Sequence, residues 1–185
     1  MASLSKHLLQ LGEIAVIPTD TVYGVVARLE DPKAVARLYA LKQRERKPGT
    51  VVAATIEQLE SLGMRQQDLL KVKDFWPAAL SVIVPCDDTL LYVHQGVGSL
   101  AVRIPDDEAL LVLLKETGPL LTSSANQPGK PPATTVLEAQ AYFGDDVSWY
   151  QDGGYIFRDP STVVRVIDDK IEVIREGAVT FNPDK

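Results

Sequence analysis

Apolar and polar positions alternate along this chain in blocks that predict strands and helices in turn. Short runs of aliphatic and β-branched residues have the length and composition of strands. These predicted strands are Ile14–Pro18, Val51–Ala54, Leu80–Val84, Leu100–Ile104, Leu120–Thr122, Thr162–Ile167 and Ile171–Arg175. Gly24–Ala27 is a further strand-like run. The last two strands are predicted to form a hairpin that turns at Asp168-Asp169-Lys170.

Helical spacing and capping residues fill the intervals between the strands. A first helix is expected over Leu4–Leu11, before Gly12. Asp31 is a predicted N-cap, because Pro32 follows it at the first helical position. Three more helices are predicted within residues 55–63, 106–118 and 135–144. This alternation favours one α/β or α+β sheet domain over residues 1–185.

Composition and charge limit the classes of function. The 19 basic and 25 acidic residues give a net charge of −6, which argues against a general nucleic-acid coat. The single cysteine, Cys86, favours a reducing compartment, and with His7 and His94 it fits no zinc spacing. The N-terminus lacks a signal-peptide pattern, and no apolar run approaches the roughly 18 residues of a membrane span. We therefore expect a cytoplasmic protein with no membrane association and no bound metal of its own.

Polar side chains interrupt the apolar pattern in two segments, each of which is either a ligand site or a turn. In IPTDTVYGVVA, four hydrogen-bonding side chains stand between two apolar runs. In LLTSSANQPGK, hydroxyls and an amide follow a strand directly, at the kind of strand end where open α/β sheets bind ligands. Residues of these types are also simple turn formers, so each segment alone leaves both interpretations open.

Basic residues are concentrated in RLYALKQRERK, residues 37–47, with five basic side chains against one acidic. Such a group can bind phosphate, or it can be a solvated helix end. Arg103 lies inside an apolar strand, where a charged side chain must face solvent or have a partner. Strand alternation places Ala101 and Arg103 on one face of the sheet and Val102 and Ile104 on the other. Arg175 raises the same question.

Six segments together resemble the YrdC-like family in order and spacing, from about Ile14 to Gly177. They are PTDTVYG, LKQR, WPAALS, LAVRIP, TSSANQPGKPP and DPSTVVRV…EVIREG. The resemblance implies a single-domain twisted mixed β-sheet flanked by helices, with a concave, positively lined cavity. It also implies the threonylcarbamoyl-AMP synthase reaction, in which L-threonine, bicarbonate and ATP yield threonylcarbamoyl adenylate and pyrophosphate. That product would supply tRNA threonylcarbamoyladenosine modification through a downstream transferase.

The resemblance assigns roles to individual residues as well. It implies that the threonine end is lined by Thr19, Thr21, Tyr23 and Arg103, with Arg103 pairing with the carboxylate. It implies that the nucleotide is bound by Lys42, Arg44, Lys47, Ser124, Asn126, Ser161 and Arg175, with Lys42 and Arg44 in catalysis. Mg²⁺ is expected to accompany ATP. No general base is assigned, because the carbamate formed from threonine is itself the nucleophile.

Departures from the family pattern leave two other functions open. Pro128-Gly129 stands where the family often has Ser-Gly, and Glu45-Arg46 stands in a stretch where an aspartate is common. One alternative is therefore a diverged relative with another substrate. The other is a non-catalytic RNA-binding or ribosome-assembly module. The net charge of −6 and the lack of interleaved aromatic residues weigh against that module, although weak tRNA or RNA binding stays compatible with the sequence.

Overall fold

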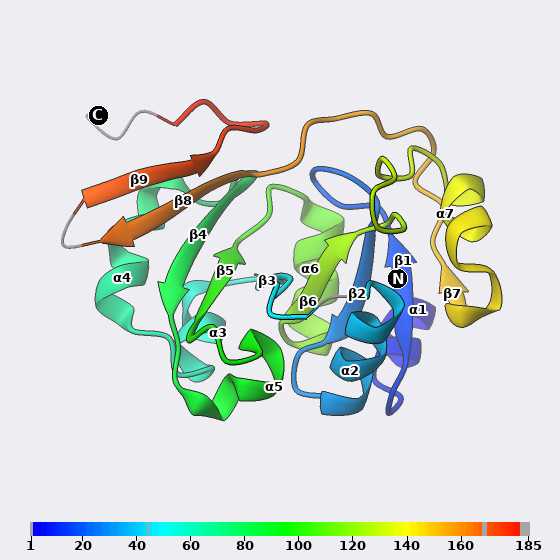
Figure 1. Ribbon diagram of the computed structural model, residues 1–185, viewed down its shortest axis with the longest axis horizontal. Coiled ribbons are helices and arrows are strands. Elements are labelled where there is room, and N and C mark those ends of the chain that lie inside the picture. Colours follow the sequence, from blue (N-terminus) through cyan, green and yellow to red (C-terminus); the bar gives the residue numbers. More distant parts are fainter. Residues whose placement is uncertain (1, 44, 168–169, 182–185) are drawn as a thin grey trace.

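The computed structural model describes residues 2–43, 45–167 and 170–181. Their strands form one nine-stranded mixed sheet, in the order β7-β1-β2-β6-β3-β5-β4-β8-β9 (Figure 1). The strands are β1 Ile14–Ile17, β2 Gly24–Arg28, β3 Thr50–Val52, β4 Leu80–Pro85, β5 Ser99–Arg103, β6 Leu120–Ser124, β7 Trp149–Tyr150, β8 Thr162–Ile167 and β9 Lys170–Arg175. Three of the strand pairs, β1/β7, β3/β5 and β4/β8, are parallel and the others antiparallel. The predicted mixed α/β sheet is confirmed.

Four of the α-helices begin at a side chain that caps the first turn. The α-helices are α1 Ala2–Leu8, α2 Pro32–Leu41, α3 Ile56–Ser61, α4 Gln66–Leu70, α5 Leu91–His94, α6 Glu108–Thr117 and α7 Val136–Phe143. Single 3-10 turns are η1 Lys73–Phe75, η2 Asp88–Leu90 and η3 Gly144–Asp146. The N-caps of α2, α3, α6 and α7 are Asp31, Thr55, Asp107 and Thr135, and each side chain accepts a hydrogen bond from the first turn of its helix.

Several boundaries differ from the sequence predictions. The first helix ends at Leu8 instead of Leu11, because the chain turns there through Gly12, whose φ is +80°. The Gly12 N–H donates to Asp31 Oδ2 at 2.6 Å, which fixes this turn against the start of α2. The short elements α4, α5 and β7 were not predicted, since two to five residues carry too little periodicity. The β8–β9 hairpin is confirmed. Of its predicted turn, residues 168–169 lie outside the described residues, and Lys170 is the first residue of β9.

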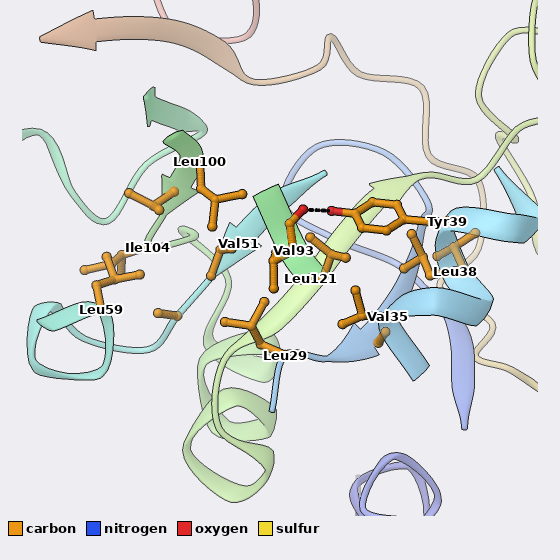
Figure 2. Packing of buried hydrophobic residues seen from close by; sticks show 14 of the residues in the cluster. Leu29, Val35, Leu38, Tyr39, Val51, Leu59, Val93, Leu100, Ile104 and Leu121 are labelled. Atoms are coloured by element: carbon orange, nitrogen blue, oxygen red, sulfur yellow. Dashed lines mark hydrogen bonds between the residues drawn. The ribbon is translucent and has the colours of Figure 1, made fainter. Parts of the chain in front are cut away.

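Apolar residues are buried on both faces of the sheet. Along β1, Ile14 and Val16 join the larger core cluster, whereas Ala15 and Ile17 join a second cluster with α1 and α6. Figure 2 shows part of the larger cluster, where residues of α2 pack against the sheet and the buried Tyr39 hydroxyl donates to the Val93 main-chain oxygen at 2.6 Å. This packing buries both faces of the sheet around the polar residues described next.

On the face that α1 and α6 cover, the side chains change from apolar to polar toward one end of three adjacent strands. Val26, Val52 and Leu120 belong to the cluster under these helices. Gly24, Thr50 and Thr122 each lie two positions away from one of these residues in the same strand, and so on the same face of the sheet. The register pairs Thr50 with both Thr122 and Ala101. The polar ends of neighbouring strands therefore lie side by side and form one wall of a hollow.

Candidate functional site

A cavity of about 400 Å³ opens at this polar end of the sheet. Its wall combines small hydroxyl side chains with two arginines from segments that are far apart in sequence. The lining residues are Thr19, Thr21, Val22, Gly24, Pro48, Gly49, Thr50, Ala101, Arg103, Thr122, Ser123, Ser124, Pro132, Pro160, Ser161, Val163 and Arg175. None of these described lining residues carries a carboxylate, so the wall is suited to an anionic or hydrogen-bonding ligand.

Arg103 is buried in the cavity wall and paired with a carboxylate. Ala101 and Arg103 both line the cavity while Val102 lies in the core, which confirms the predicted alternation along β5. Arg103 Nη2 donates to Asp20 Oδ1 at 2.9 Å, and the two side chains are only 4% and 3% exposed. Burial raises the pKa of Asp20, and the Arg103 charge opposes that shift. Burial also lowers the pKa of Arg103, but a guanidinium stays protonated in proteins.

In the PTDTVYG segment, some polar side chains line the cavity and others bond to main-chain groups elsewhere in the fold. Thr19 and Thr21 line the cavity. The Thr19 hydroxyl donates to the Val22 oxygen at 2.6 Å and lies 3.1 Å from the Thr21 hydroxyl. Tyr23 does not belong to the lining: its buried hydroxyl donates to Gly154 O at 2.9 Å and accepts from Gly153 N at 2.8 Å. Tyr23 therefore ties the start of β2 to the loop at Gly153 and Gly154. Its contact with threonine stays a prediction.

Lys42 and the SAN segment, predicted from distant parts of the sequence, meet in space. Lys42 is 5% exposed, and its ammonium donates to Ser124 O at 2.8 Å, to Asn126 Oδ1 at 3.0 Å and to the Asn126 main-chain oxygen. The Ser124 hydroxyl donates to Asn126 Oδ1 at 2.6 Å, and Ser124 lines the cavity. The cation therefore lies behind the wall, where it holds the turn that carries two predicted nucleotide contacts.

Ser161 and Arg175 close the cavity from the β8–β9 side. Arg175 Nη2 donates to Ser161 O at 2.6 Å, and the Ser81 hydroxyl donates to Ser161 Oγ at 2.9 Å. Both residues line the cavity, and burial lowers the pKa of Arg175. Arg103 and Arg175 thus bring two cations from β5 and β9 to one hollow.

Two predicted phosphate ligands are not placed at this cavity by the structure. Lys47 lines a separate surface hollow with Tyr39, Gln43 and Glu45, and its main-chain N–H donates to Gln95 Oε1 at 3.1 Å. Arg44 lies outside the described residues. The phosphate-binding roles of Lys47 and Arg44 therefore stay predictions.

The sequence assignment missed several residues that the structure brings to the site. Thr50, Thr122 and Ser123 line the cavity, and Asp20 lies directly behind Arg103. The signal for Asp20 was its place between two buried strands, where an ionised carboxylate needs a partner. That partner is 83 residues away, so no local pattern in the sequence could identify it.

Neither a resident metal site nor a membrane span is found in the described part of the chain. Within residues 2–43, 45–167 and 170–181, no three His, Cys, Asp or Glu side chains gather closely enough to hold a metal ion. No helix there has both the length and the apolar character needed to cross a bilayer.

Comparison with known proteins gives consistent matches. Residues 7–177 match the Sua5, YciO and YrdC family, described as "Telomere recombination". The chain is 35% identical to the threonylcarbamoyl-AMP synthase of Bacillus subtilis (strain 168), covering 94% of this chain and 52% of that protein. It is 34% identical to the threonylcarbamoyl-AMP synthase of Vibrio campbellii, covering 91% of this chain and 95% of that relative.

The fold is shared with a solved structure as well. The crystal structure of P. abyssi Sua5 complexed with L-threonine superposes with a TM-score of 0.84 at 29% identity, covering 95% of this chain and 53% of that one. This chain thus spans about half the length of the Bacillus and P. abyssi proteins. Because the family match runs over residues 7–177, nearly the whole chain, this protein belongs to the Sua5/YciO/YrdC family.

Proposed function

We propose that this chain is a threonylcarbamoyl-AMP synthase, which condenses L-threonine, bicarbonate and ATP and releases pyrophosphate. The observation that carries the proposal is the convergence of Thr19, Thr21, Arg103, Ser124 and Arg175 on one cavity. The relatives named threonylcarbamoyl-AMP synthase and the P. abyssi Sua5 structure with L-threonine support it.

The proposed reaction has two bond-forming steps. The neutral threonine amine attacks the carbon of bicarbonate, and one amine hydrogen leaves with the bicarbonate hydroxyl group as water, so that a carbamate forms. A carbamate oxygen then attacks the α-phosphorus of ATP, and the bond from that phosphorus to the bridging oxygen breaks to release pyrophosphate. Because nucleophile and electrophile are both anionic, the main task of the protein is to position them and to balance their charge.

The two arginines and the hydroxyls of the wall suit this task. Arg103 provides donors for a carboxylate, and the hydroxyls of Thr19 and Thr21 provide hydrogen bonds for a small polar amino acid. Arg175 adds positive charge near Ser161 at the other side of the hollow. No group in this scheme serves as a strong base, in keeping with a carbamate that is nucleophilic once formed.

The nucleotide is proposed to lie against the Ser124–Asn126 turn. Lys42 holds that turn through three oxygen acceptors, so its charge lies directly behind the surface where phosphate groups would lie. Arg44 and Lys47 are proposed to approach the triphosphate from the segment after α2. Mg²⁺ is proposed to enter on the phosphates of ATP as part of the substrate.

A pyrophosphate-release assay with each substrate omitted in turn tests the proposal. Release should require L-threonine, bicarbonate and ATP together. Release that continues without threonine or bicarbonate would show that the chain is some other ATP-consuming enzyme. A Thr21→Val variant should raise the KM for threonine more than that for ATP, because Thr21 is placed at the amino-acid end. The matched control, Thr180→Val, changes an exposed threonine outside the cavity and should alter neither value.

The proposal also covers partners and location. Threonylcarbamoyl adenylate is a reactive mixed anhydride, so a tRNA-modifying transferase should take it up soon after release. A cytoplasmic location fits this use of the product and the single cysteine of the chain.

A further inference from the structure

The buried pair of Asp20 and Arg103 makes fewer hydrogen bonds than its chemistry allows. Arginine and carboxylate groups often form two parallel N–H···O bonds. Here one bond joins Nη2 to Oδ1 at 2.9 Å. Among the described residues, Asp20 Oδ2 and Arg103 Nε have no hydrogen-bond partner, although both atoms are buried. One hydrogen bond therefore joins the two side chains directly, and the Nε donor of the guanidinium is unused.

Asp20 acts from behind the cavity wall. Arg103 lines the cavity, and Asp20 is absent from the described residues that line it. Asp20 lies in the turn between β1 and β2, and its main-chain oxygen accepts from Arg158 Nη1 at 3.3 Å. This second contact ties the turn to the β7–β8 connection, residues 151–161. Asp20 is thus held in place independently of Arg103, as a residue that orients a neighbour must be.

The charge of Asp20 changes what the cavity attracts. With Asp20 ionised, the pair is neutral as a whole and strongly dipolar. A neutral, dipolar wall matches a zwitterionic amino acid, which also has no net charge. Without the carboxylate, Arg103 and Arg175 would present two uncompensated cations to one hollow, and such a site favours multiply charged phosphate ions.

We propose that Asp20 is a positioning and specificity residue: it orients Arg103 and reserves this end of the cavity for a zwitterionic amino acid over inorganic phosphate. The inference rests on the proposed function, since it takes the amino-acid substrate to bind at Arg103. Asp20 touches no reactant in this account and acts through the guanidinium alone.

The Asp20→Asn variant tests the inference, because it keeps the size of the side chain and one acceptor oxygen but removes the charge. Binding of L-threonine and of inorganic phosphate is measured by titration calorimetry, with thermal shifts as a second readout. We expect the affinity for threonine to fall at least about tenfold and the affinity for phosphate to rise severalfold. An unchanged ratio of the two affinities overturns the proposal.

Asp31→Asn is the matched control. Asp31 is also a buried carboxylate, at 1% exposure, but it caps α2 and does not line the cavity. This variant should lose stability and keep the wild-type ratio of threonine to phosphate affinity. A purely structural role for Asp20 would make the two variants behave alike, which would also overturn the proposal.

Two outcomes separate this inference from the proposed function. If the wild-type chain does not bind threonine, the proposed function fails, and the phosphate titration still decides whether Asp20 restricts anion binding. If Asp20→Asn does not fold, Asp20→Asn with Arg103→Gln removes both charges of the pair. That double variant should lose threonine binding and keep the wild-type affinity for phosphate, and retained threonine binding would refute the role given to the pair.

Discussion

Replacing Tyr23 by phenylalanine removes one hydroxyl that ties the β7–β8 connection, residues 151–161, to the start of β2. The Tyr23 ring is fully buried, and its hydroxyl bonds to Gly153 N at 2.8 Å and to Gly154 O at 2.9 Å. Burial raises the pKa of Tyr23, so the phenol is neutral and remains a donor near pH 7. In Figure 1 the connection, in orange, runs along the top of the view from β7 to β8.

The cost of Tyr23→Phe follows from these two hydrogen bonds. A typical intramolecular hydrogen bond contributes about 0.5–1.5 kcal/mol net. Because Gly153 and Gly154 are exposed, water can replace the lost partner, and the ring itself is retained, so no cavity forms. We therefore expect a loss of about 1–2 kcal/mol. With about 2.1 cal/mol/K of unfolding entropy per residue, that loss lowers the Tm of this chain by about 3–5 °C.

Thermal unfolding and limited digestion with chymotrypsin check this prediction. Tyr155 and Phe157 are 72% and 79% exposed, so a connection that opens more often should be cut faster there. Tyr92→Phe is the control, because its hydroxyl donates to Leu29 O at 2.9 Å, far along the chain from the connection. It should lose stability without faster cutting at 155–157. An unchanged Tm and cutting rate for Tyr23→Phe, with a large rise in the KM for threonine, would refute the bracing role and support direct contact with the ligand.

Three further substitutions test the wall, the cation behind it and a buried cap. Gly24→Ala should lower the free energy of unfolding by about 1–3 kcal/mol and raise the KM for threonine, because the added Cβ would lie 2.7 Å from Thr122 Oγ1. Urea unfolding and steady-state kinetics check the two effects, and unchanged values of both would contradict the close contact. Lys42→Ala should abolish pyrophosphate release while circular dichroism shows an intact fold, because the oxygens of Asn126 lose their cationic partner; near-normal turnover would exclude the role given to Lys42. Burial alone would raise the pKa of Asp31, but main-chain N–H donors outweigh this effect, and the net result is a pKa below 3.8. The stability that Asp31 contributes is therefore present above about pH 4 and is lost as the pH falls through the folded-state pKa. Urea unfolding at pH 7 and pH 3 should show the difference between wild type and Asp31→Asn shrinking at low pH, and an equal difference at both would refute this sign.

Much of the local structure was determined by the sequence alone. The predicted N-cap Asp31 begins a helix, and the helices predicted within residues 55–63 and 135–144 begin at the N-caps Thr55 and Thr135. An N-cap acts locally, because its side-chain oxygen accepts from main-chain donors in the first turn of its own helix. The alternation in LAVRIP likewise predicted that Arg103 and Val102 lie on opposite faces of the sheet, because successive side chains of a strand point to opposite faces. The family motifs, too, are features of short segments.

Only the tertiary structure decided which of these segments meet. The order of the strands brings Asp20 to Arg103 across 83 residues, and Lys42 to Asn126 across 84. It also turned the hydroxyl of Tyr23 toward Gly153 and Gly154 instead of into the cavity. Such contacts depend on the packing of both faces of the sheet, and a strand's own residues do not specify its neighbours. The sequence therefore supplied the chemical groups of the site, whereas the partner of each group was set by long-range packing that no local pattern encodes.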